Sequence, residues 1–407
     1  MKKWYKLDNV GKFYASTSNS KIPKVFRYSA YLTDNIEENI LQEALNKTII
    51  IYPNFSVNLK KGIFWYYLDE TNKKNKVTKE NLPICFKIYN NSDDFLYRVS
   101  YYKNKINIEV SHILSDGRGS VEFFKLLLTN YISLKYNLNT KQKNNTQLEK
   151  AEDSYIKYYE KSKYKRNKNL KTYIYKRKKY RNQTQYLECY TDVKSILELA
   201  HKYDTTLTIF LTSVLIYSFR NELKVSELNK YIKIDLPVDL RTYFNSHSSM
   251  NFFGLTTITY KFNSKNVELE DIIKDVKKQF EQKIISKELA KRANYMVSFE
   301  KNWFCRFAPI FLKNIVLNLA DKLTNNTSTT CLSNIGVIKL DSKIEEKINS
   351  ISVLTSTNNF QITTCTFKDQ ICIGIANTYT NNDIIKNFCC YFSQNNIKLK
   401  INVSEVK

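Results

Sequence analysis

The sequence predicts a mixed α/β fold made of two similar lobes, each a mixed sheet flanked by helices. The main observation is a repeat: a hairpin pattern followed by a helical pattern occurs at 95–136 and again at 360–393. The chain also has 407 residues, 43% of them hydrophobic and spread throughout, which suits two domains of ordinary size. We therefore expect an N-terminal lobe at 1–160, a basic crossover connector at 161–189 and a C-terminal lobe at 190–407.

The first lobe alternates between strand and helix patterns. VFRYSAYL (25–32) is typical of a strand, residues 36–50 carry apolar side chains at helical spacing, and two extended runs surround Gly62. FLYRVSYY and KINIEVSH (95–112), separated by a short Lys-Asn turn, predict an antiparallel hairpin. Serine is a residue type that caps helices, so we expect the next helix to begin at Ser120.

The connector is the most basic part of the chain. Eleven of the twenty-one residues from Lys161 to Arg181 are Lys or Arg, which predicts a solvated segment. The whole chain has a net charge of +25, and such a field favours anions: nucleic acid, acidic proteins, anionic membranes or a phosphate-rich cofactor. The joint abundance of Lys, Asn, Ile and Tyr offers a compositional explanation instead, as an AT-rich genome would produce.

The second lobe begins near residue 190 and repeats the same kinds of pattern. In order, we expect two helices within 193–219 broken near Asp204 and Thr205, a strand from Tyr231 ended by Pro237, a strand at 256–262, a long charged helix from about Leu269 to Ala293, a hairpin around Lys368 and Asp369, and a helix at 382–392.

Chemistry concentrates in SHILSDGRGS (111–120), where His112 stands four residues before Asp116 and Gly117. The alternation of KINIEVSH places His112 on the apolar face of a strand, at its end, so the ring points toward an interior cleft. A histidine there can act as a general base, and the Asp-Gly turn fixes the backbone behind it. The alternative is a core histidine bonded to a backbone carbonyl. The chain has only three histidines and seven glycines, which favours the functional interpretation.

The second hairpin ends in NTYTNND (377–383) and carries no histidine. With one candidate base in two repeated lobes, we expect a single active site. Its natural place is the groove between the lobes.

The pattern HxxxDG after a strand, in a chain of two repeated lobes, resembles the CoA-dependent acyltransferase superfamily with the chloramphenicol acetyltransferase-like fold. LPVDLRTYF (236–244) with NFFG (251–254) is similar to an element of its condensation-like members, and TCLSNIGVI (330–338) is similar to a segment of the alcohol acetyltransferase group. The plant-type DFGWG motif is absent, and Ser111 stands where condensation domains carry a second histidine. The resemblance therefore favours a stand-alone acyltransferase acting on alcohols or amines.

The resemblance implies a role for each motif residue. His112 is the expected catalytic base, and Asp116 and Gly117 support the site structurally. Arg241 is the expected partner of Asp116, because a buried carboxylate without a cation is strongly unfavourable. Three residues are candidates for binding the oxyanion or lining the tunnel: Ser333, Asn334 and Asn251. Ordinary turn chemistry before Gly336 explains Ser333 and Asn334 equally well.

The expected partners are acyl-CoA as co-substrate and a small alcohol or amine, with no bound cofactor and no metal. A carrier-protein thioester as donor and a catalytically silent scaffold of the same fold stay open as alternatives. Specific nucleic-acid binding is not expected, because only the connector combines basic and aromatic residues. The first residues carry early lysines and no apolar run, so we expect no signal peptide. Residues 303–320 are interrupted by Arg306 and Lys313, which fits an amphipathic helix better than a membrane span. With eight scattered cysteines interpreted as reduced thiols, we expect a cytoplasmic protein.

Overall fold

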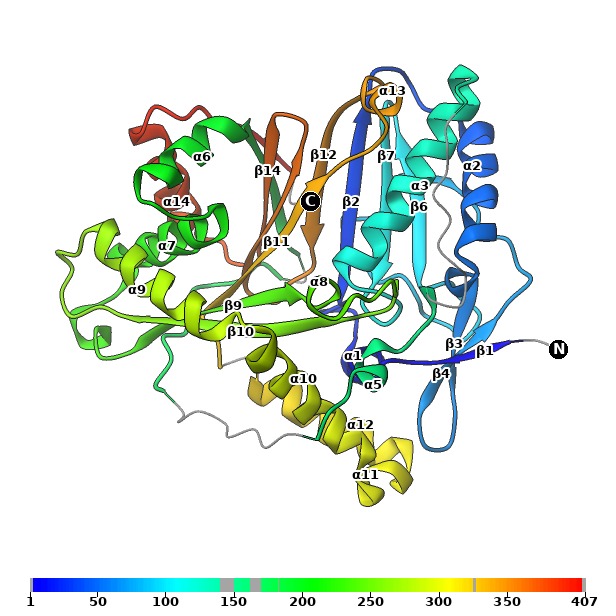
Figure 1. The fold of residues 1–407 in the computed structure, drawn as a ribbon, viewed down its shortest axis with the longest axis horizontal. Coiled ribbons are helices and arrows are strands. Elements are labelled where there is room, and N and C mark those ends of the chain that lie inside the picture. The colour runs from blue at the N-terminus through cyan, green and yellow to red at the C-terminus, as the bar shows by residue number, and fades with distance from the viewer. Residues whose placement is uncertain (1–2, 140–149, 162–169, 182, 325–326, 405–407) are drawn as a thin grey trace.

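The computed structural model describes residues 3–139, 150–161, 170–181, 183–324 and 327–404 (Figure 1). It contains a five-stranded sheet in one lobe, a seven-stranded sheet in the other, and a small three-stranded sheet beside the first lobe. The predicted mixed α/β architecture with two lobes is confirmed.

The first lobe is built on a sheet whose central strands are the predicted hairpin. Its order is β12 (Ile348–Thr355), β2 (Val25–Leu32), β7 (Lys105–Ser111), β6 (Tyr97–Tyr102) and β5 (Thr78–Lys79). The small sheet has the order β1 (Trp4–Lys6), β4 (Tyr66–Glu70) and β3 (Val57–Lys61). The helical elements of this lobe are α1 (Asn9–Thr17), α2 (Glu38–Ile51), η1 (Pro53–Phe55), α3 (Gly117–Tyr136) and α5 (Ser154–Lys157).

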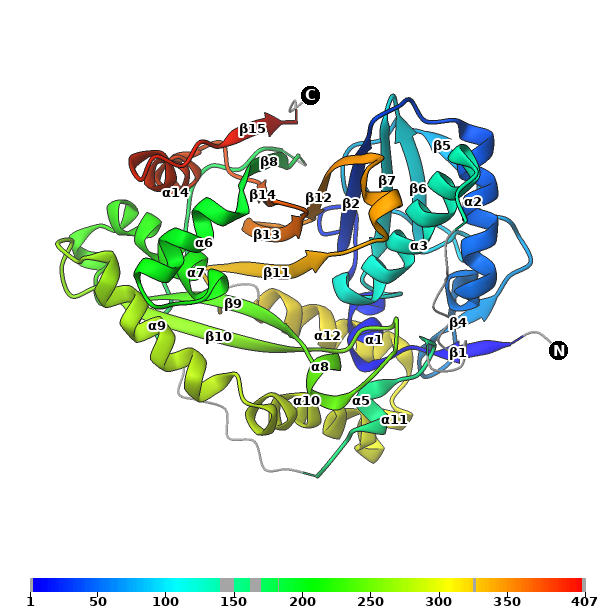
Figure 2. The ribbon, with the colours of Figure 1, turned by 45° about the horizontal axis from the view of Figure 1, so that its top comes forward.

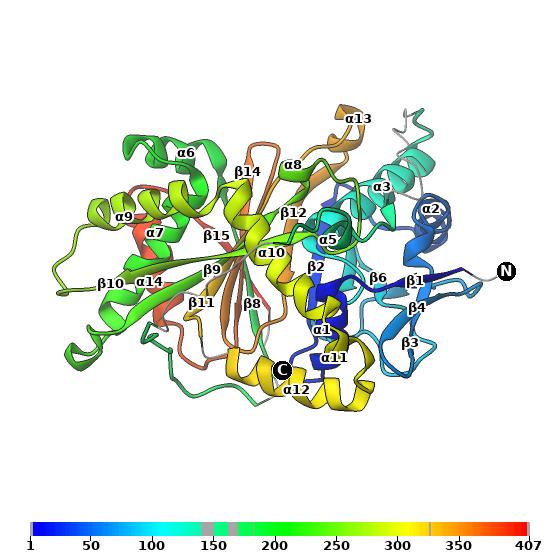
Figure 3. The same cartoon turned by 60° about the horizontal axis from the view of Figure 1, so that its bottom comes forward.

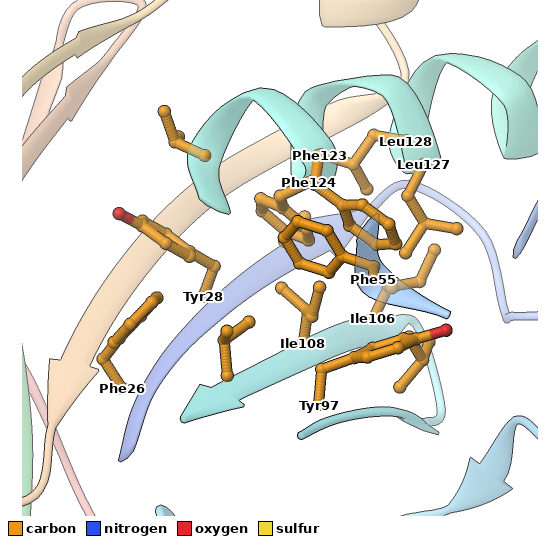
Figure 4. Close-up of a cluster of buried hydrophobic side chains, with 14 of the residues drawn as sticks. Phe26, Tyr28, Phe55, Tyr97, Ile106, Ile108, Phe123, Phe124, Leu127 and Leu128 are labelled. Atoms are coloured by element: carbon orange, nitrogen blue, oxygen red, sulfur yellow. The ribbon is translucent and has the colours of Figure 1, made fainter. Parts of the chain in front are cut away.

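Aromatic side chains fill the space between this sheet and α3 (Figure 4). Phe55 stacks on Phe123 with ring centroids 4.3 Å apart, and Tyr28 stacks on Phe124 at 5.6 Å. The opposite face of β7 is buried as well: Glu109 is 2% exposed and forms ion pairs with Arg27 and Arg98. Because both faces of β7 are covered, the residue that follows it is held firmly in place.

The second lobe has a mixed sheet in the order β10 (Phe253–Lys261), β9 (Tyr231–Asp239), β11 (Thr330–Ile338), β13 (Phe360–Phe367), β14 (Gln370–Asn377), β8 (Gln185–Asp192) and β15 (Lys400–Val403). Its helical elements are α6 (Val193–Lys202), α7 (Leu207–Phe219), η2 (Arg220–Glu222), η3 (Val225–Glu227), α8 (Arg241–Phe244), α9 (Leu269–Lys283), α10 (Ser286–Lys301), α11 (Trp303–Phe307), α12 (Ile310–Thr324) and α14 (Asp383–Gln394). The short helix α13 (Ser342–Glu345) packs with β12 and α3 in the first lobe. The helices α6, α7, α9 and α14 pack together on one side of this sheet (Figure 2).

One strand from the C-terminal part of the chain joins the sheet of the first lobe. β12 follows β11 along the chain, yet it pairs antiparallel with β2 of the first lobe (Figure 1). The division of the chain at 160 and 190 that we propose therefore has this exception. Since β12 also packs against β13 and β14, it holds the two sheets side by side along the groove.

Several local expectations are corrected by the structure. The helix α3 begins at Gly117 and not at Ser120, because Asp116 caps it by accepting a hydrogen bond from the Gly119 amide. The long charged helix is divided into α9 and α10, since the β-branched pair Ile284–Ile285 leaves the helical conformation. Pro237 lies inside β9 and does not end it; β9 pairs with β11 only near Ile234, so that side of the strand is free at the proline.

The described part of the connector is packed on the second lobe, whereas its composition predicts a solvated segment. Residues 162–169 and 182 lie outside the described part of the chain. In the described part, Tyr173 and Tyr175 are 1% and 4% exposed and belong to the core of the second lobe. Tyr173 donates its backbone N–H to the carbonyl of Tyr231, at 2.8 Å. Aromatic rings alternate with the cations here, so this half of the connector docks on the lobe despite its charge.

Candidate active site

His112 is the first residue after β7, at the boundary between the lobes. Its backbone N–H donates to the carbonyl of Lys24 at 2.8 Å, and its own carbonyl accepts from Nδ2 of Asn251 at 3.0 Å. The imidazole lies between two aromatic rings, with centroid distances of 4.8 Å to Phe26 and 5.3 Å to Tyr14. The backbone and the ring are therefore both fixed, as a positioned base requires.

The environment of His112 favours its neutral form. Burial lowers the pKa of His112 to about 4; the carboxylate of Asp116 acts in the opposite direction, the ammonium of Lys24 lowers the pKa further, and the Asn251 side chain raises it. The ring atom Nδ1 is buried without a hydrogen-bond partner, as is Oδ1 of the neighbouring Asn251. A buried histidine usually satisfies its ring nitrogens. Because Nδ1 is out of reach of solvent, a substrate in the cavity would have to meet the ring at its other nitrogen, Nε2.

The expected pairing of Asp116 with Arg241 is present. Nη1 and Nη2 of Arg241 each lie 3.1 Å from the Asp116 carboxylate, which also accepts from the Phe252 amide at 2.7 Å. Burial opposes the charge of Arg241, but the carboxylates of Asp116 and Asp239 outweigh it and raise the pKa of the guanidinium. Asp116 thus caps α3 and binds the second lobe with the same carboxylate.

Glycines let the two lobes approach closely at the turn after His112. A Cβ on Gly117 would lie 2.7 Å from the Ile335 side chain and 3.2 Å from the Tyr28 hydroxyl. A Cβ on Gly119 would meet the Ser249 carbonyl oxygen at 2.3 Å, which is closer than carbon and oxygen can approach. A side chain at Gly117 would therefore collide with both lobes, and the restriction is tighter still at Gly119.

Asn251 holds the loop of His112 from the second lobe. Besides bonding the His112 carbonyl, it donates both its backbone N–H and Nδ2 to Oδ2 of Asp8, at 3.1 and 3.0 Å. Burial raises the pKa of Asp8 to about 7, assisted by the charge of Asp153, while the hydrogen bonds from Gly11 and Asn251 lower it. Asn251 consequently positions the backbone at His112, and its side-chain amide is used in the contacts with His112 and Asp8.

The strand β11 carries the two other candidates. Oδ1 of Asn334 accepts from the Gly336 amide at 2.9 Å and from the Thr364 hydroxyl at 3.1 Å, while Nδ2 donates to Thr208. These bonds stabilise a bulge in β11, and Gly336 has the positive φ of 84° that such a bend favours. The turn interpretation therefore suits Asn334. Ser333 has its Cα opposite Thr363 of β13, and both residues line the cavity.

A cavity of about 340 Å³ lies between the lobes at His112. Its walls come from both lobes and combine charged, hydroxyl and apolar side chains: Tyr14, Lys24, Phe26, Tyr28, His112, Asp116, Arg118, Asp235, Asp239, Arg241, Leu255, Cys331, Ser333, Asn334, Ile335 and Thr363 among others. Of the residues singled out from the sequence, only Asn251 is not part of this lining, although it bonds His112 directly. The expected groove is thus present and assembled around His112.

Sequence reasoning missed several residues of the site. Thr363 has a buried Oγ1 without a hydrogen-bond partner, and Arg118 donates to the Ile335 carbonyl at 2.9 Å across the groove. Asp8 and Tyr14 come from the N-terminal segment, more than ninety positions before His112. Among these residues, only Arg118 could have been selected from the sequence, because it lies within the DGRG motif (116–119). The other two histidines, His201 and His247, are exposed. Within the described residues, no cluster of metal-ligating side chains is present.

Comparison with known proteins identifies the fold. No protein-family model matches the sequence, and no curated protein matches it. Among solved structures, TRI101 of F. sporotrichioides, complexed with coenzyme A and T-2, is similar with a TM-score of 0.65 at 12% identity, over 98% of this chain and 99% of that one. The TRI3 trichothecene 15-O-acetyltransferase from Fusarium sporotrichioides has a TM-score of 0.60 at 11% identity, covering 95% and 94%.

A condensation domain has the same architecture. The starter condensation domain of rhizomide synthetase, in complex with C8-CoA, has a TM-score of 0.63 at 11% identity, over 96% of this chain and 94% of that one. Likeness at this level of identity is a statement about fold. The chain therefore has the two-lobed, chloramphenicol acetyltransferase-like fold of these acyltransferases and condensation domains.

Proposed function

We propose that this protein, with its acyltransferase-like fold, transfers an acyl group from a thioester donor, acyl-CoA, to an alcohol or amine, with His112 as the general base. The observation that carries the proposal is the imidazole itself. It is fixed between two aromatic rings and lines a cavity walled by both lobes.

The chemistry requires a neutral base at the point where two substrates meet. With a pKa near 4, His112 is neutral at pH 7 and can take the proton of the acceptor hydroxyl or amine as that group attacks the thioester carbonyl. The imidazolium formed is stabilised by the nearby carboxylate of Asp116. It then returns the proton to the departing thiolate, so no covalent acyl-enzyme is needed. General-base catalysis contributes about 10²–10⁴-fold, and positioning in the cavity supplies much of the rest.

The developing oxyanion needs a hydrogen-bond donor on the opposite wall. Ser333 and Thr363 are neighbours on paired strands, and both face the cavity. The Thr363 hydroxyl is buried and has no partner in the protein, so it can donate without breaking an existing bond once a ligand packs directly against this wall. We assign the oxyanion contact to this hydroxyl pair, and we assign Asn334 to the bulge.

Substrate turnover tests the proposal. Full-length protein is incubated with acyl-CoA donors of increasing chain length and with alcohols and amines, and thiol release and the acylated product are measured. We expect release that depends on the acceptor, and its loss in Ser333→Phe, which places a ring in the cavity. His247→Ala, at an exposed histidine, is the control that keeps the rate.

A parallel incubation separates the two kinds of donor. The same acyl group is presented on an acidic carrier protein. Turnover with the carrier alone would assign the donor to that class and contradict acyl-CoA. Absence of acceptor-dependent release with both donors would overturn the proposal and favour the catalytically silent scaffold.

A further inference from the structure

The helices α11 and α12 present an apolar face to solvent. Its members are nine large side chains, between 46% and 76% exposed, which we call the α11–α12 face: Trp303, Phe304, Phe307, Phe311, Leu312, Ile315, Val316, Leu319 and Leu323. In α12 they recur at intervals of three and four residues and so form one stripe. Figure 3 shows both helices on the outside of the molecule. An exposed apolar surface of this size marks an interaction site.

The orientation of α12 is inverted relative to an ordinary surface helix. Its polar residues face the protein: Lys313 donates to the Phe64 carbonyl at 2.8 Å, Asn314 to the Tyr66 hydroxyl at 3.0 Å, and Asn318 to the Ser16 carbonyl at 2.8 Å. Asp321 pairs with Lys24 at 3.3 Å. Four polar contacts thus hold the helix with its apolar stripe outward. Such an arrangement is stable when the outer environment is itself apolar.

The face continues onto the tip of the β3–β4 hairpin. Ile63 is 76% exposed, and its carbonyl accepts from the Ile310 amide at 2.9 Å. The ring of Phe64 lies 6.0 Å from that of Phe307 in an edge-to-face contact. Segments separated by about 240 positions in the chain therefore contribute to one continuous apolar surface.

The exposed charges within the segments that form this surface are positive. From residue 301 to residue 324, the exposed ionic residues are Lys301, Arg306 and Lys322, and the single acid, Asp321, is buried in its ion pair. Lys61 is exposed at the hairpin tip. An apolar, aromatic-rich face bordered by cations is complementary to a bilayer surface with anionic headgroups. The net charge of +25 adds long-range attraction to such a surface.

We propose that the α11–α12 face docks the protein on anionic lipid bilayers. α12 has 15 residues, and within the described chain no helix is long and apolar enough to cross a membrane, so the helix lies in the interface. Through Ser16 and Lys24, α12 is bound to the segment that carries Tyr14 and lines the cavity. Docking therefore places that wall of the cavity next to the lipid surface. The docking itself does not depend on acyl transfer.

Vesicle flotation with the full chain tests the proposal. We expect binding to phosphatidylcholine vesicles containing phosphatidylglycerol. The double variant Ile315→Glu/Leu319→Glu should bind at least about tenfold more weakly, since burying one large apolar side chain is worth about that factor. Both positions are exposed, 63% and 58%, so the melting temperature should not change. The matched control is Val225→Glu, an apolar residue 79% exposed on η3, which should bind like the parent.

The lipid and salt dependence of binding, and the oligomeric state, give the results that would contradict the proposal. Binding should weaken in pure phosphatidylcholine and at high salt, where the Debye length is short. Equal binding to neutral and anionic vesicles would contradict the electrostatic part of the proposal. If the parent binds no vesicles but forms dimers in light scattering that Ile315→Glu/Leu319→Glu abolishes, the face is an interface between copies and membrane docking is wrong.

Discussion

The two hairpin–helix units of this protein have the same architecture and different endings. In the first, β7 ends at Ser111 and α3 begins at Gly117; in the second, β14 ends at Asn377 and α14 begins at Asp383. Five residues link strand to helix in each unit. His112 and Thr378 therefore occupy the same place after the strand, and Asp116 and Asn382 the same place before the helix.

The second link satisfies its polar groups within its own lobe. The Thr378 hydroxyl donates to the carbonyls of Asn358 and Asn359, at 3.1 and 2.9 Å. The Asn377 amide is bonded to Tyr379 and to Asn382 within the same link. In the first link, by contrast, a ring nitrogen of His112 has no partner and Asp116 bonds across to the other lobe. One scaffold thus gives either a closed structural turn or an open site, depending on where its hydrogen bonds go.

The largest expected difference in stability is between alanine variants of Asp116 and of Asn382, the residues just before the two helices. Asp116→Ala leaves Arg241 buried without its main partner, and we expect a loss of about 3–5 kcal/mol in the free energy of unfolding. Asn382→Ala should cost less, because Asn382 makes no capping hydrogen bond. Chemical denaturation measures both. The double variant Asp116→Ala/Arg241→Met should recover part of the loss; a double variant no more stable than Asp116→Ala would show that the ion pair is not the cause.

The second hairpin contributes to the site through Thr363 on β13, and Thr363→Val tests this contribution. The substitution keeps the shape and removes the hydroxyl. We expect kcat to fall about 10²-fold, the usual loss for one oxyanion donor. The melting temperature should stay the same or rise, because burying an unpartnered hydroxyl is unfavourable. A lower melting temperature with an unchanged kcat would make Thr363 a structural residue.

Asn377, the last residue of β14, braces the second link, and Asn377→Ala tests whether that link is purely structural. Asn377 is 1% exposed and its amide group makes four hydrogen bonds within the link. Its loss should reduce the free energy of unfolding by about 1–3 kcal/mol and leave acyl-transfer rates at a permissive temperature unchanged. A selective fall in rate, with stability preserved, would place catalytic function in both links.

The pH dependence of stability has a defined sign. An unfolded histidine binds a proton near pH 6.5, whereas folded His112 does so only near pH 4. The stability contributed by neutral His112 is therefore complete above about pH 6.5 and is lost as the pH falls toward 4. His112→Gln removes this titration. Between pH 7 and pH 4.5, the free energy of unfolding of the parent should therefore fall more than that of the variant. A constant difference would mean that the pKa of His112 is not lowered.

The sequence predicted the parts of the site that depend on local pattern. The hairpin around 103–104, the position of His112 at its end and the pairing of Asp116 with Arg241 followed from alternation and from the resemblance. What could not be predicted depends on long-range contacts. The capture of β12 by β2 and the burial of Tyr173 and Tyr175 in a basic segment are tertiary outcomes without a local signal.

The same reason explains the missed site residues. Thr363 looks like any threonine of a core strand, and only its partner strand β11 places it opposite Ser333. Asn334 was a candidate for the oxyanion, but its amide bonds Gly336 and Thr364, contacts that form only with the bulge. Conversely, the apolar stripe of α12 was visible as an amphipathic pattern, but the pattern alone does not reveal that the polar side faces inward.

The central claim is that, of the two links, only the first carries a catalytic residue, and the rate of thiol release from acyl-CoA with a fixed acceptor tests it most directly. His112→Ala and Thr378→Ala change the same place in the two units and are compared with the parent at a temperature where all three are folded. We predict a fall of about 10²–10⁴-fold for His112→Ala and a change of at most a few-fold for Thr378→Ala. Retained turnover in folded His112→Ala, or an equal loss in both variants, would contradict the account.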